Sequence, residues 1–296
     1  MEFDRERYDL QFLYYLLTIL DLPGLAKGVK RGINRNEAYA MLVAVPQLSA
    51  QRRIVSILNK AFESIATAKA NAEKNLRNAR DVFDSYQQTV FTQRGDGWIE
   101  RQLGEIAAFR NGINFTKTSK GAPIRILGVR DFQSNHWAPL DELESVTPDG
   151  VVPDSDTLQE NDVVFVRSNG NPELIGRCLL VGAVSERTTH SGFTIKARLQ
   201  ALDVLPAYLC HFLKSTRARR EMIDGGVGAN IKSLNQGTLS RIVIPFPSVP
   251  DQAQIVQRLE VMKEESQRLG SIFRHKLAAL DELKKSLLHR AFTGEL

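Results

Sequence analysis

The most regular pattern of apolar positions lies between Gln51 and Gln93, a stretch without proline or glycine. Apolar residues recur there at alternating steps of four and three, with one additional step of four between Ala72 and Leu76. This spacing predicts a long α-helix that carries a heptad seam with one stutter. The seam consists of Ile54, Leu58, Ala61, Ile65, Ala68, Ala72, Leu76, Ala79, Phe83, Tyr86 and Val90.

The same pattern occurs again 201 positions later, and no gap is needed to align the two copies. The second seam is Ile255, Leu259, Met262, Ser266, Leu269, Phe273, Leu277, Leu280, Lys284, Leu287 and Ala291, of which nine are apolar. A helix with so narrow an apolar stripe is unstable alone, so we expect the two to bury their seams on each other. The alanines of the first copy allow close approach, which favours an antiparallel pair. The alternative is two ordinary surface helices of one domain.

Between the two helical patterns the chain changes to short strand-like runs separated by turn signals. These runs cover residues 124–129, 162–166, 178–181 and 193–195, and helical spacing follows over 205–220. We therefore expect an α+β protein, in which a mixed α/β domain is attached to a long antiparallel two-helix coiled coil. The expected boundaries are 51–94 for the first long helix, 95–250 for the mixed domain and 251–296 for the second long helix.

Composition narrows the function classes only slightly. The chain has 296 residues and a formal net charge of +5, a weak indication of a polyanionic partner. Its two cysteines, Cys178 and Cys210, form neither a metal-binding motif nor a disulfide framework. The start of the chain is unlike a signal peptide, and no apolar stretch is long enough to span a membrane. We expect a cytoplasmic protein with no membrane partner.

The order of motifs resembles the specificity subunits of type I restriction-modification systems over essentially the whole chain. In that family an Asn-containing segment, a hydrophobic strand and a proline-rich turn precede Gln-x-x-Ile-Val at the start of each long helix. The second copy here is Asn230–Asn235, Ile242–Pro247 and Gln252–Val256, and the first is Gly32–Asn34, Val43–Pro46 and Gln51–Val55. Leu103–Ala107 with Asn111-Gly112 resembles the opening of a target-recognition domain.

The resemblance implies a bacterial or archaeal DNA-reading subunit. Family members carry two recognition domains, whereas residues 1–50 match only the end of a first one, so we expect this chain to read one half of a bipartite double-stranded DNA target. The implied protein partners are methyltransferase subunits and a restriction/translocase subunit, and a homodimer is an alternative way to restore the pair. S-adenosylmethionine, ATP and Mg²⁺ would belong to those partners, with no cofactor in this chain.

No catalytic constellation is evident in the sequence. Asn171-Pro172-Glu173-Leu174 shares only its first two residues with the loop of adenine methyltransferases and is more typical of a turn. The five histidines, His136, His190, His211, His275 and His289, show no metal-ligand spacing. Two classes remain open: a non-catalytic DNA-reading subunit, and a coiled-coil scaffold or partner protein that never reads DNA, including a non-productive truncated subunit.

Candidate DNA contacts lie in the second half of the mixed domain, where residues 163–250 contain eleven basic and five acidic residues. Arginine pairs with guanine and asparagine with adenine in the major groove, and lysine contacts phosphate. The candidates are Arg167, Ser168, Asn169, Asn171, Arg177, Lys196, Arg198, Asn230 and Lys232. The alternative for the asparagines is that they only cap turns.

Overall fold

The computed structural model describes residues 4–20, 26–27, 32–33, 36, 39–132, 136–224 and 233–295. The chain forms two compact units. The first unit comprises Met1–Arg80 and Ser266–Leu296, and the second comprises Asp81–Glu265. The boundary between the units therefore falls within both long helices, and each unit is described by itself below.

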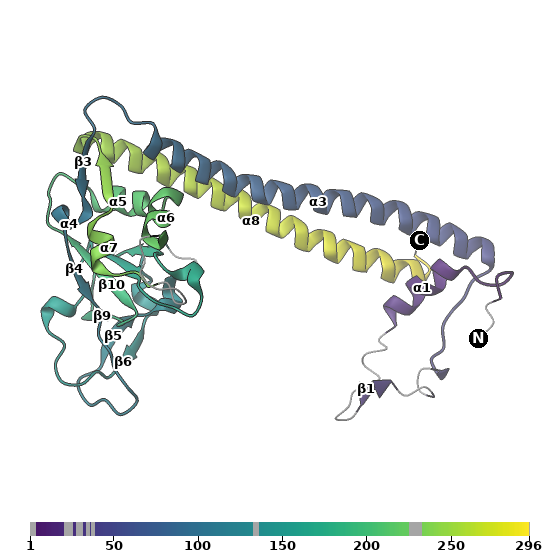
Figure 1. Cartoon of the computed structure of the whole chain (residues 1–296). Helices are drawn as coiled ribbons and strands as arrows, with labels where there is room; N and C mark the ends of the chain where they lie inside the picture. Colours follow the sequence, from purple (N-terminus) through teal and green to yellow (C-terminus); the bar gives the residue numbers. More distant parts are fainter. Residues whose placement is uncertain are drawn as a thin grey trace. The chain divides into compact units, whose positions relative to one another are not determined.

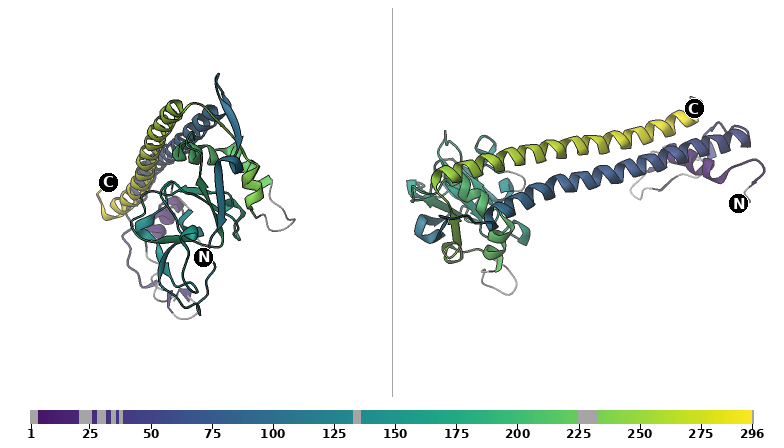
Figure 2. Two further views of the ribbon diagram at one scale, coloured as in Figure 1. Left: turned by 90° about the vertical axis from the view of Figure 1, so that its left-hand side faces the viewer. Right: turned by 90° about the horizontal axis from the view of Figure 1, so that it is seen from above.

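The two long helices are α3 (Leu48–Thr92) and α8 (Val249–Thr293), each of 45 residues. In the first unit they lie side by side (Figures 1 and 2). Three contacts fix their direction: the Ser266 hydroxyl donates to the Ala79 carbonyl, Lys69 pairs with Asp281 at 2.7 Å, and Lys284 lies 5.0 Å from the centre of the Phe62 ring. Residue numbers rise on one helix as they fall on the other, so the predicted antiparallel pair is confirmed.

The apolar seam of α3 is also confirmed, because all eleven predicted positions are buried or half-buried. The seam of α8 departs from the prediction at two positions, because Leu269 and Lys284 are exposed. Leu269 is 38% exposed, whereas Gly270 is buried, and a Cβ atom on Gly270 would lie 3.6 Å from Leu76. The stutter of α8 thus falls about two turns earlier than the 201-residue offset predicts, and Gly270 lies beside Leu76 of the opposite helix.

In the first unit, a short helix packs on the ends of the long ones. This helix is α1 (Leu10–Ile19), whose first turn is capped by the Asp9 carboxylate, which accepts hydrogen bonds from the amides of Gln11 and Phe12. Phe12 is buried with its ring 5.0 Å from that of Phe292. Two short antiparallel strands, β1 (Ala26–Lys27) and β2 (Gly32–Ile33), follow along the chain. The interpretation of residues 1–50 as the end of a first recognition domain stays a prediction.

The second unit contains three small sheets and several short helices (Figure 1). The central sheet is fully antiparallel, in the order β4 (Ala107–Asn111), β10 (Thr194–Leu199), β7 (Val163–Val166) and β8 (Cys178–Leu180). A second sheet has the order β6 (Glu144–Val146), β5 (Ile124–Leu127) and β9 (Thr188–His190), and β11 (Val243–Phe246) pairs with β3 (Ile99–Gln102). The helices are α4 (Leu103–Ile106), α5 (Pro206–Leu213), α6 (Thr216–Asp224) and α7 (Gln236–Ser240). The predicted α+β class is confirmed.

The central sheet is covered on both faces, which explains the uninterrupted apolar run of β7. Val163 and Phe165 belong to a core cluster that also includes Phe91 from the end of α3 and Leu259 from α8. Val164 and Val166 point to the opposite face and belong to a separate cluster. The side-chain alternation of a single strand therefore divides the core of the second unit into two layers.

The start of α8 is tied to the second unit by a buried glutamine. The Gln252 side chain is fully buried, and its amide nitrogen donates to the carbonyls of Asp203 (2.8 Å) and Pro247 (2.9 Å). Its side-chain oxygen accepts from the backbone amide of Leu205 (2.8 Å), the residue that precedes α5. Gln252 thus links the start of α8 to the segment that precedes α5 and to the segment that precedes α8.

The start of α3 repeats this arrangement inside the first unit. Gln51 is equally buried and donates to the carbonyls of Pro46 (2.8 Å) and Arg7 (3.0 Å). Its oxygen accepts from the amide of Asp9 (2.8 Å), the residue that precedes α1. The sequence repeat is therefore also a repeat of hydrogen bonds, and α1 occupies the place in the first unit that α5 occupies in the second.

No described helix has the length and apolar content that crossing a membrane requires.

Candidate nucleic-acid interface

Several loops meet at one edge of the central sheet. Because β10 runs antiparallel to both β4 and β7, its first residues lie beside the last residues of those strands: Ile195 pairs with Asn111, and Thr194 pairs with Val166. The loop after β4, the turn before β10 and the loop after β7 therefore emerge together. The segment before α7 joins them, since the Leu234 amide donates to the Arg167 carbonyl at 2.8 Å.

The turn before β10 connects these loops through backbone hydrogen bonds. The Phe193 carbonyl accepts from the amides of Arg167 (2.8 Å) and Ser168 (3.3 Å), and the Gly192 amide donates to the Ile113 carbonyl (2.7 Å). The neighbouring Gly112 could not be any other residue without displacement, because a Cβ there would lie 2.2 Å from two backbone oxygens. The resulting edge, which we call the strand-end surface, is defined by Asn111, Arg167, Ser168, Phe193 and Gln236.

The strand-end surface offers the mixture of groups that nucleic-acid recognition uses. Arg167 is half-buried, and its guanidinium makes no hydrogen bond or ion pair with any residue that the structure describes. The Phe193 ring is 58% exposed. Asn111 accepts a hydrogen bond from the side chain of Gln236 at 3.1 Å, which leaves further amide groups of this pair facing solvent. A cation, an aromatic ring and paired amides can together contact phosphate, base faces and base edges.

Asn169 and Asn171, predicted to read bases, cap turns in this structure. The Asn169 side-chain oxygen accepts from the amide of Asn171 (2.8 Å), and the Asn171 oxygen accepts from the amide of Glu173 (3.0 Å). The latter bond starts the short 3₁₀ helix Pro172–Leu174, so the turn predicted at that motif is present. Pairing with adenine needs the same oxygens as acceptors, and base contact by these two residues stays a prediction.

Arg177 is half-buried, and its side chain forms hydrogen bonds with the backbone of the loop that follows β7. Its guanidinium donates to the carbonyls of Glu173 (3.3 Å) and Phe132 (3.4 Å). Arg219 on α6 also donates to the Glu173 carbonyl (2.8 Å). Both arginines are therefore engaged with the backbone that follows β7, and Arg177 positions the strand-end surface rather than extending it.

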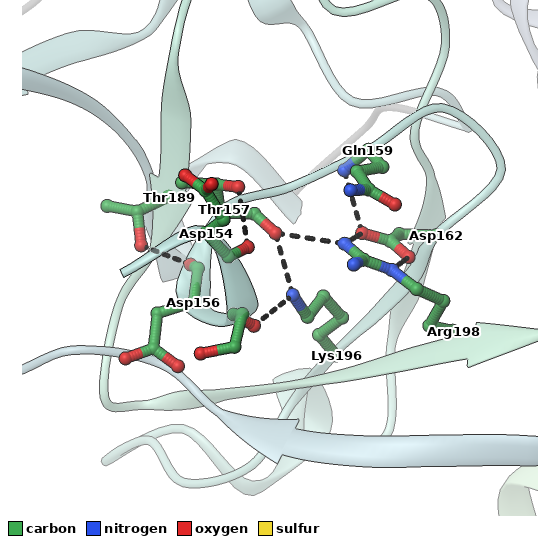
Figure 3. Close-up of polar contacts among 9 residues, drawn as sticks. Asp154, Asp156, Thr157, Gln159, Asp162, Thr189, Lys196 and Arg198 are labelled. Carbon is green, nitrogen blue, oxygen red and sulfur yellow. Dashed lines mark hydrogen bonds and ion pairs between the residues drawn. The ribbon is translucent and has the colours of Figure 1, made fainter. Parts of the chain in front are cut away.

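Lys196 and Arg198 do not fit the predicted role of DNA contacts, because both face a loop that covers the sheet (Figure 3). Lys196 is buried, and its ammonium donates to the carbonyls of Ser155 (2.8 Å) and Thr157 (2.7 Å). Burial lowers the pKa of Lys196 from its ordinary value. Arg198 forms a two-pronged ion pair with the buried Asp162, both bonds being 2.8 Å.

This placement corrects the sequence interpretation of β10. Lys196 and Arg198 are predicted DNA contacts because they lie in the basic half of the domain, but a loop closes over their face of β10 and its carbonyls accept hydrogen bonds from both. The hydrogen bonds that Arg198 donates to the Asp162 carboxylate raise the pKa of Arg198, so the guanidinium stays charged in this ion pair. The two residues stabilise the loop over 155–162. The remaining candidates, Asn230 and Lys232, lie outside the described residues.

Sequence reasoning missed Asn111, Phe193 and Gln236. Each was visible in the chain, but nothing in the local pattern indicates that they meet. Their proximity follows from the strand order β4-β10-β7, in which residues far apart in the sequence share one edge. The only local signal was the Ser-Gly-Phe turn before β10, where an exposed aromatic residue follows a glycine.

Comparison with known proteins now adds to this geometry. Residues 95–271 match the family model of the type I restriction modification DNA specificity domain. The chain belongs to this family. The match includes the whole central sheet and every loop of the strand-end surface.

Two curated relatives from Escherichia coli show how far the similarity extends. The chain is 27% identical over 272 residues to the type I restriction enzyme EcoKI specificity subunit of strain K12, covering 86% of this chain and 57% of that protein. It is 35% identical over 324 residues to the EcoDI specificity subunit, covering 97% of this chain and 70% of that one. The chain thus spans little more than half the length of the EcoKI subunit.

Solved structures support the same fold. A chain from a study of complex assembly and conformational transition of a type I R-M system superposes with a TM-score of 0.80 at 17% identity, covering 100% of this chain and 74% of that one. The HsdS subunit from Thermoanaerobacter tengcongensis gives a TM-score of 0.61 at 19% identity, covering 99% and 72%. At these identities the likeness concerns the fold alone.

Proposed function

We propose that this chain is a non-catalytic specificity subunit that reads one half of a bipartite double-stranded DNA target through the strand-end surface. The observation that carries the proposal is the family match over 95–271, the segment that builds this surface. Arg167 supports it further, because a half-buried guanidinium without a partner among the described residues is available to an incoming phosphate or guanine.

The reading step follows from the geometry of the loops. Backbone bonds to the Phe193 carbonyl hold Arg167 and Ser168 beside the exposed ring, so these groups approach DNA as one unit. Arg167 would supply the bidentate contact, while the ring packs against a base or sugar. A bidentate contact is worth about 1–3 kcal/mol of discrimination against the wrong base, or roughly 5- to 150-fold in affinity.

The test compares two basic residues that the sequence alone cannot distinguish. After methylation mapping in cells with the complete system has identified the target, DNA binding is measured as a function of salt. Arg167→Ala should weaken binding to the target by about 5- to 150-fold and relax the choice of one base. Lys196→Ala should lower the melting temperature, because two buried carbonyls lose their donor, yet leave the salt dependence of the folded protein unchanged.

A second arginine serves as the matched control. Arg258 is an exposed residue of α8 in the second unit and is not part of the strand-end surface. Arg258→Ala should bind the target with unchanged specificity. If Arg167→Ala leaves both target choice and affinity unaltered, the strand-end surface does not read DNA. If the intact chain shows no salt-dependent binding to any duplex, the scaffold alternative is favoured instead.

The proposed protein partners are methyltransferase subunits and a restriction/translocase subunit, which would bring S-adenosylmethionine, ATP and Mg²⁺. Exposed polar positions along α3 and α8 in the first unit are available for such subunits. Co-purification with a cognate methyltransferase tests this arrangement. Light scattering of the isolated chain tests whether two copies associate, which would place two reading domains in one assembly.

A further inference from the structure

A cluster of three potential metal ligands lies in the second unit, away from the strand-end surface. His136 lies between β5 and β6 along the chain, His211 lies on α5 and Glu260 lies on α8. One ligand atom from each residue falls within 4.8 Å of the other two. Among the described residues no other group of three histidine, cysteine or acidic side chains comes so close together. The sequence analysis found no ligand spacing because the three residues are far apart in the chain.

The distances suit a small ion with few adjustments. His211 Nε2 lies 2.8 Å from Glu260 Oε1, and His136 Nε2 lies 3.6 Å from the same oxygen. The two imidazole rings are 4.8 Å apart. Zinc bonds of about 2.0–2.1 Å at tetrahedral angles separate neighbouring ligand atoms by roughly 3.3 Å. The three side chains already approach that spacing without the backbone having to move.

One ring nitrogen of His211 has no role in the fold as it stands. The His211 side chain is fully buried, and its Nδ1 atom has no hydrogen-bond partner among the described residues. Nε2 is the ring nitrogen that faces Glu260 and would bind the ion, so Nδ1 lies on the opposite side of the ring and would carry the proton of a metal-bound His211.

The internal repeat shows that the junction itself does not require metal ligands. At the equivalent place in the first unit, the Tyr15 hydroxyl donates to Asn59 Oδ1 at 2.6 Å. That neutral pair joins α1 to α3 as His211 and Glu260 join α5 to α8. The second unit therefore replaces a simple hydrogen bond by two zinc-type ligands, and the recognition domain adds a third, His136.

Neighbouring charges determine how strongly the site is expected to bind a metal ion. The positive charge of Lys214 acts on His136. Lys263 lies 3.2 Å from Glu260 Oε2, which leaves Oε1 for an ion. Both lysines repel a cation, so we expect weaker binding than at a structural zinc site with four protein ligands.

We propose that His136, His211 and Glu260 bind Zn²⁺ or a similar divalent transition-metal ion, with water in the fourth position. The ion would link the segment between β5 and β6 to α5 and α8. That segment is already held beside the central sheet, because the Leu180 amide donates to the His136 carbonyl at 3.3 Å. The site thus stabilises the junction between the recognition sheet and the long helix, and it carries out no reaction.

The experiment uses the full chain without an affinity tag, treated with EDTA and then titrated with ZnCl₂ by calorimetry. Binding of one ion per chain is expected, and a hundredfold excess over the dissociation constant should raise the melting temperature by about 5 °C or more. Co²⁺ in place of Zn²⁺ should give visible d–d absorption bands.

Variants separate this site from adventitious binding. His136→Gln removes a partly exposed ligand and should weaken Zn²⁺ binding at least tenfold, with a metal-free melting curve close to that of the parent. Glu260→Gln keeps an oxygen acceptor for His211 and should weaken it similarly. His275→Gln, which removes an exposed histidine of α8, should change nothing. Absence of binding, or equal binding by His136→Gln, overturns the proposal whatever the outcome of the DNA measurements.

Discussion

Replacing Gln252 by alanine should destabilise the second unit far more than a surface substitution would. The change removes a fully buried amide and leaves three backbone groups without partners: the carbonyls of Asp203 and Pro247 and the amide of Leu205. Each buried group without a partner costs about 1–3 kcal/mol, and water can partly compensate in the space left by the side chain. We therefore expect a loss of about 3–5 kcal/mol.

A loss of that size is a large part of the roughly 5–15 kcal/mol that stabilises a typical folded protein. Urea denaturation should show it as a lower midpoint, and hydrogen exchange should locate it at the start of α5. Gln252→Glu is the sharper variant, because a carboxylate fills the same space but cannot donate to the two carbonyls. It should be at least as destabilising as Gln252→Ala.

The internal repeat supplies a matched control for this prediction. Gln51 makes the same three kinds of hydrogen bond in the first unit, so Gln51→Ala should expose the amides at the start of α1 and leave those of α5 protected. The reasoning is refuted if Gln252→Ala shifts stability by less than about 1 kcal/mol, a value typical of a surface site. It is equally refuted if both variants lose protection in the same helix.

Three further outcomes follow from individual side chains. Burial lowers the pKa of His190 to about 3. The stability that the neutral imidazole contributes is therefore complete above its unfolded pKa of about 6.5 and falls as the pH drops below that value. Urea midpoints measured between pH 7 and pH 5 should decline less for His190→Gln than for the parent protein. Leu259→Ala, at a fully buried seam position, should cost about 2–5 kcal/mol, whereas Val261→Ala, at an exposed position of the same helix, should cost little in the same denaturation assay. Gly112→Ala should disturb the turn at Ser191, because the added methyl collides with the backbone of that turn. The loss in free energy of DNA binding should exceed the loss in free energy of unfolding.

The two long helices could be predicted because their apolar residues recur at a regular spacing. A heptad seam depends on spacing alone, and the offset of 201 residues gave a second, independent reading of the same element. Even so, the pattern misplaced the stutter of α8, since it could not tell that Gly270 rather than Leu269 faces Leu76. Which residue of α8 faces Leu76 depends on the side chains of the opposite helix, and the periodicity of one helix carries no information about them.

The candidate site was harder to predict because it depends on strand order. Composition identified a basic half of the domain, but it could not separate Arg167, which has no partner among the described residues, from Lys196, which two carbonyls surround. Both are cations in or next to a short apolar strand. Their surroundings differ only because the loop over 154–157 covers β10, and no local sequence pattern predicts that loop. The cluster of His136, His211 and Glu260 escaped notice for the same reason.

The second unit therefore divides its polar groups between two tasks. The polar groups on the loop-covered face of β10 and at the starts of α5 and α8 form hydrogen bonds with backbone atoms. A change at Lys196 or Gln252 therefore alters stability before it alters binding. Those at the ends of β4, β7 and β10 contribute little to the core, since the Phe193 ring is exposed and the Arg167 guanidinium makes no hydrogen bond with a described residue. Substitutions there should change what is bound while the fold persists. On the proposed function, substitutions in the loops fixed by backbone hydrogen bonds can thus alter the target without rebuilding the junction that Gln252 holds.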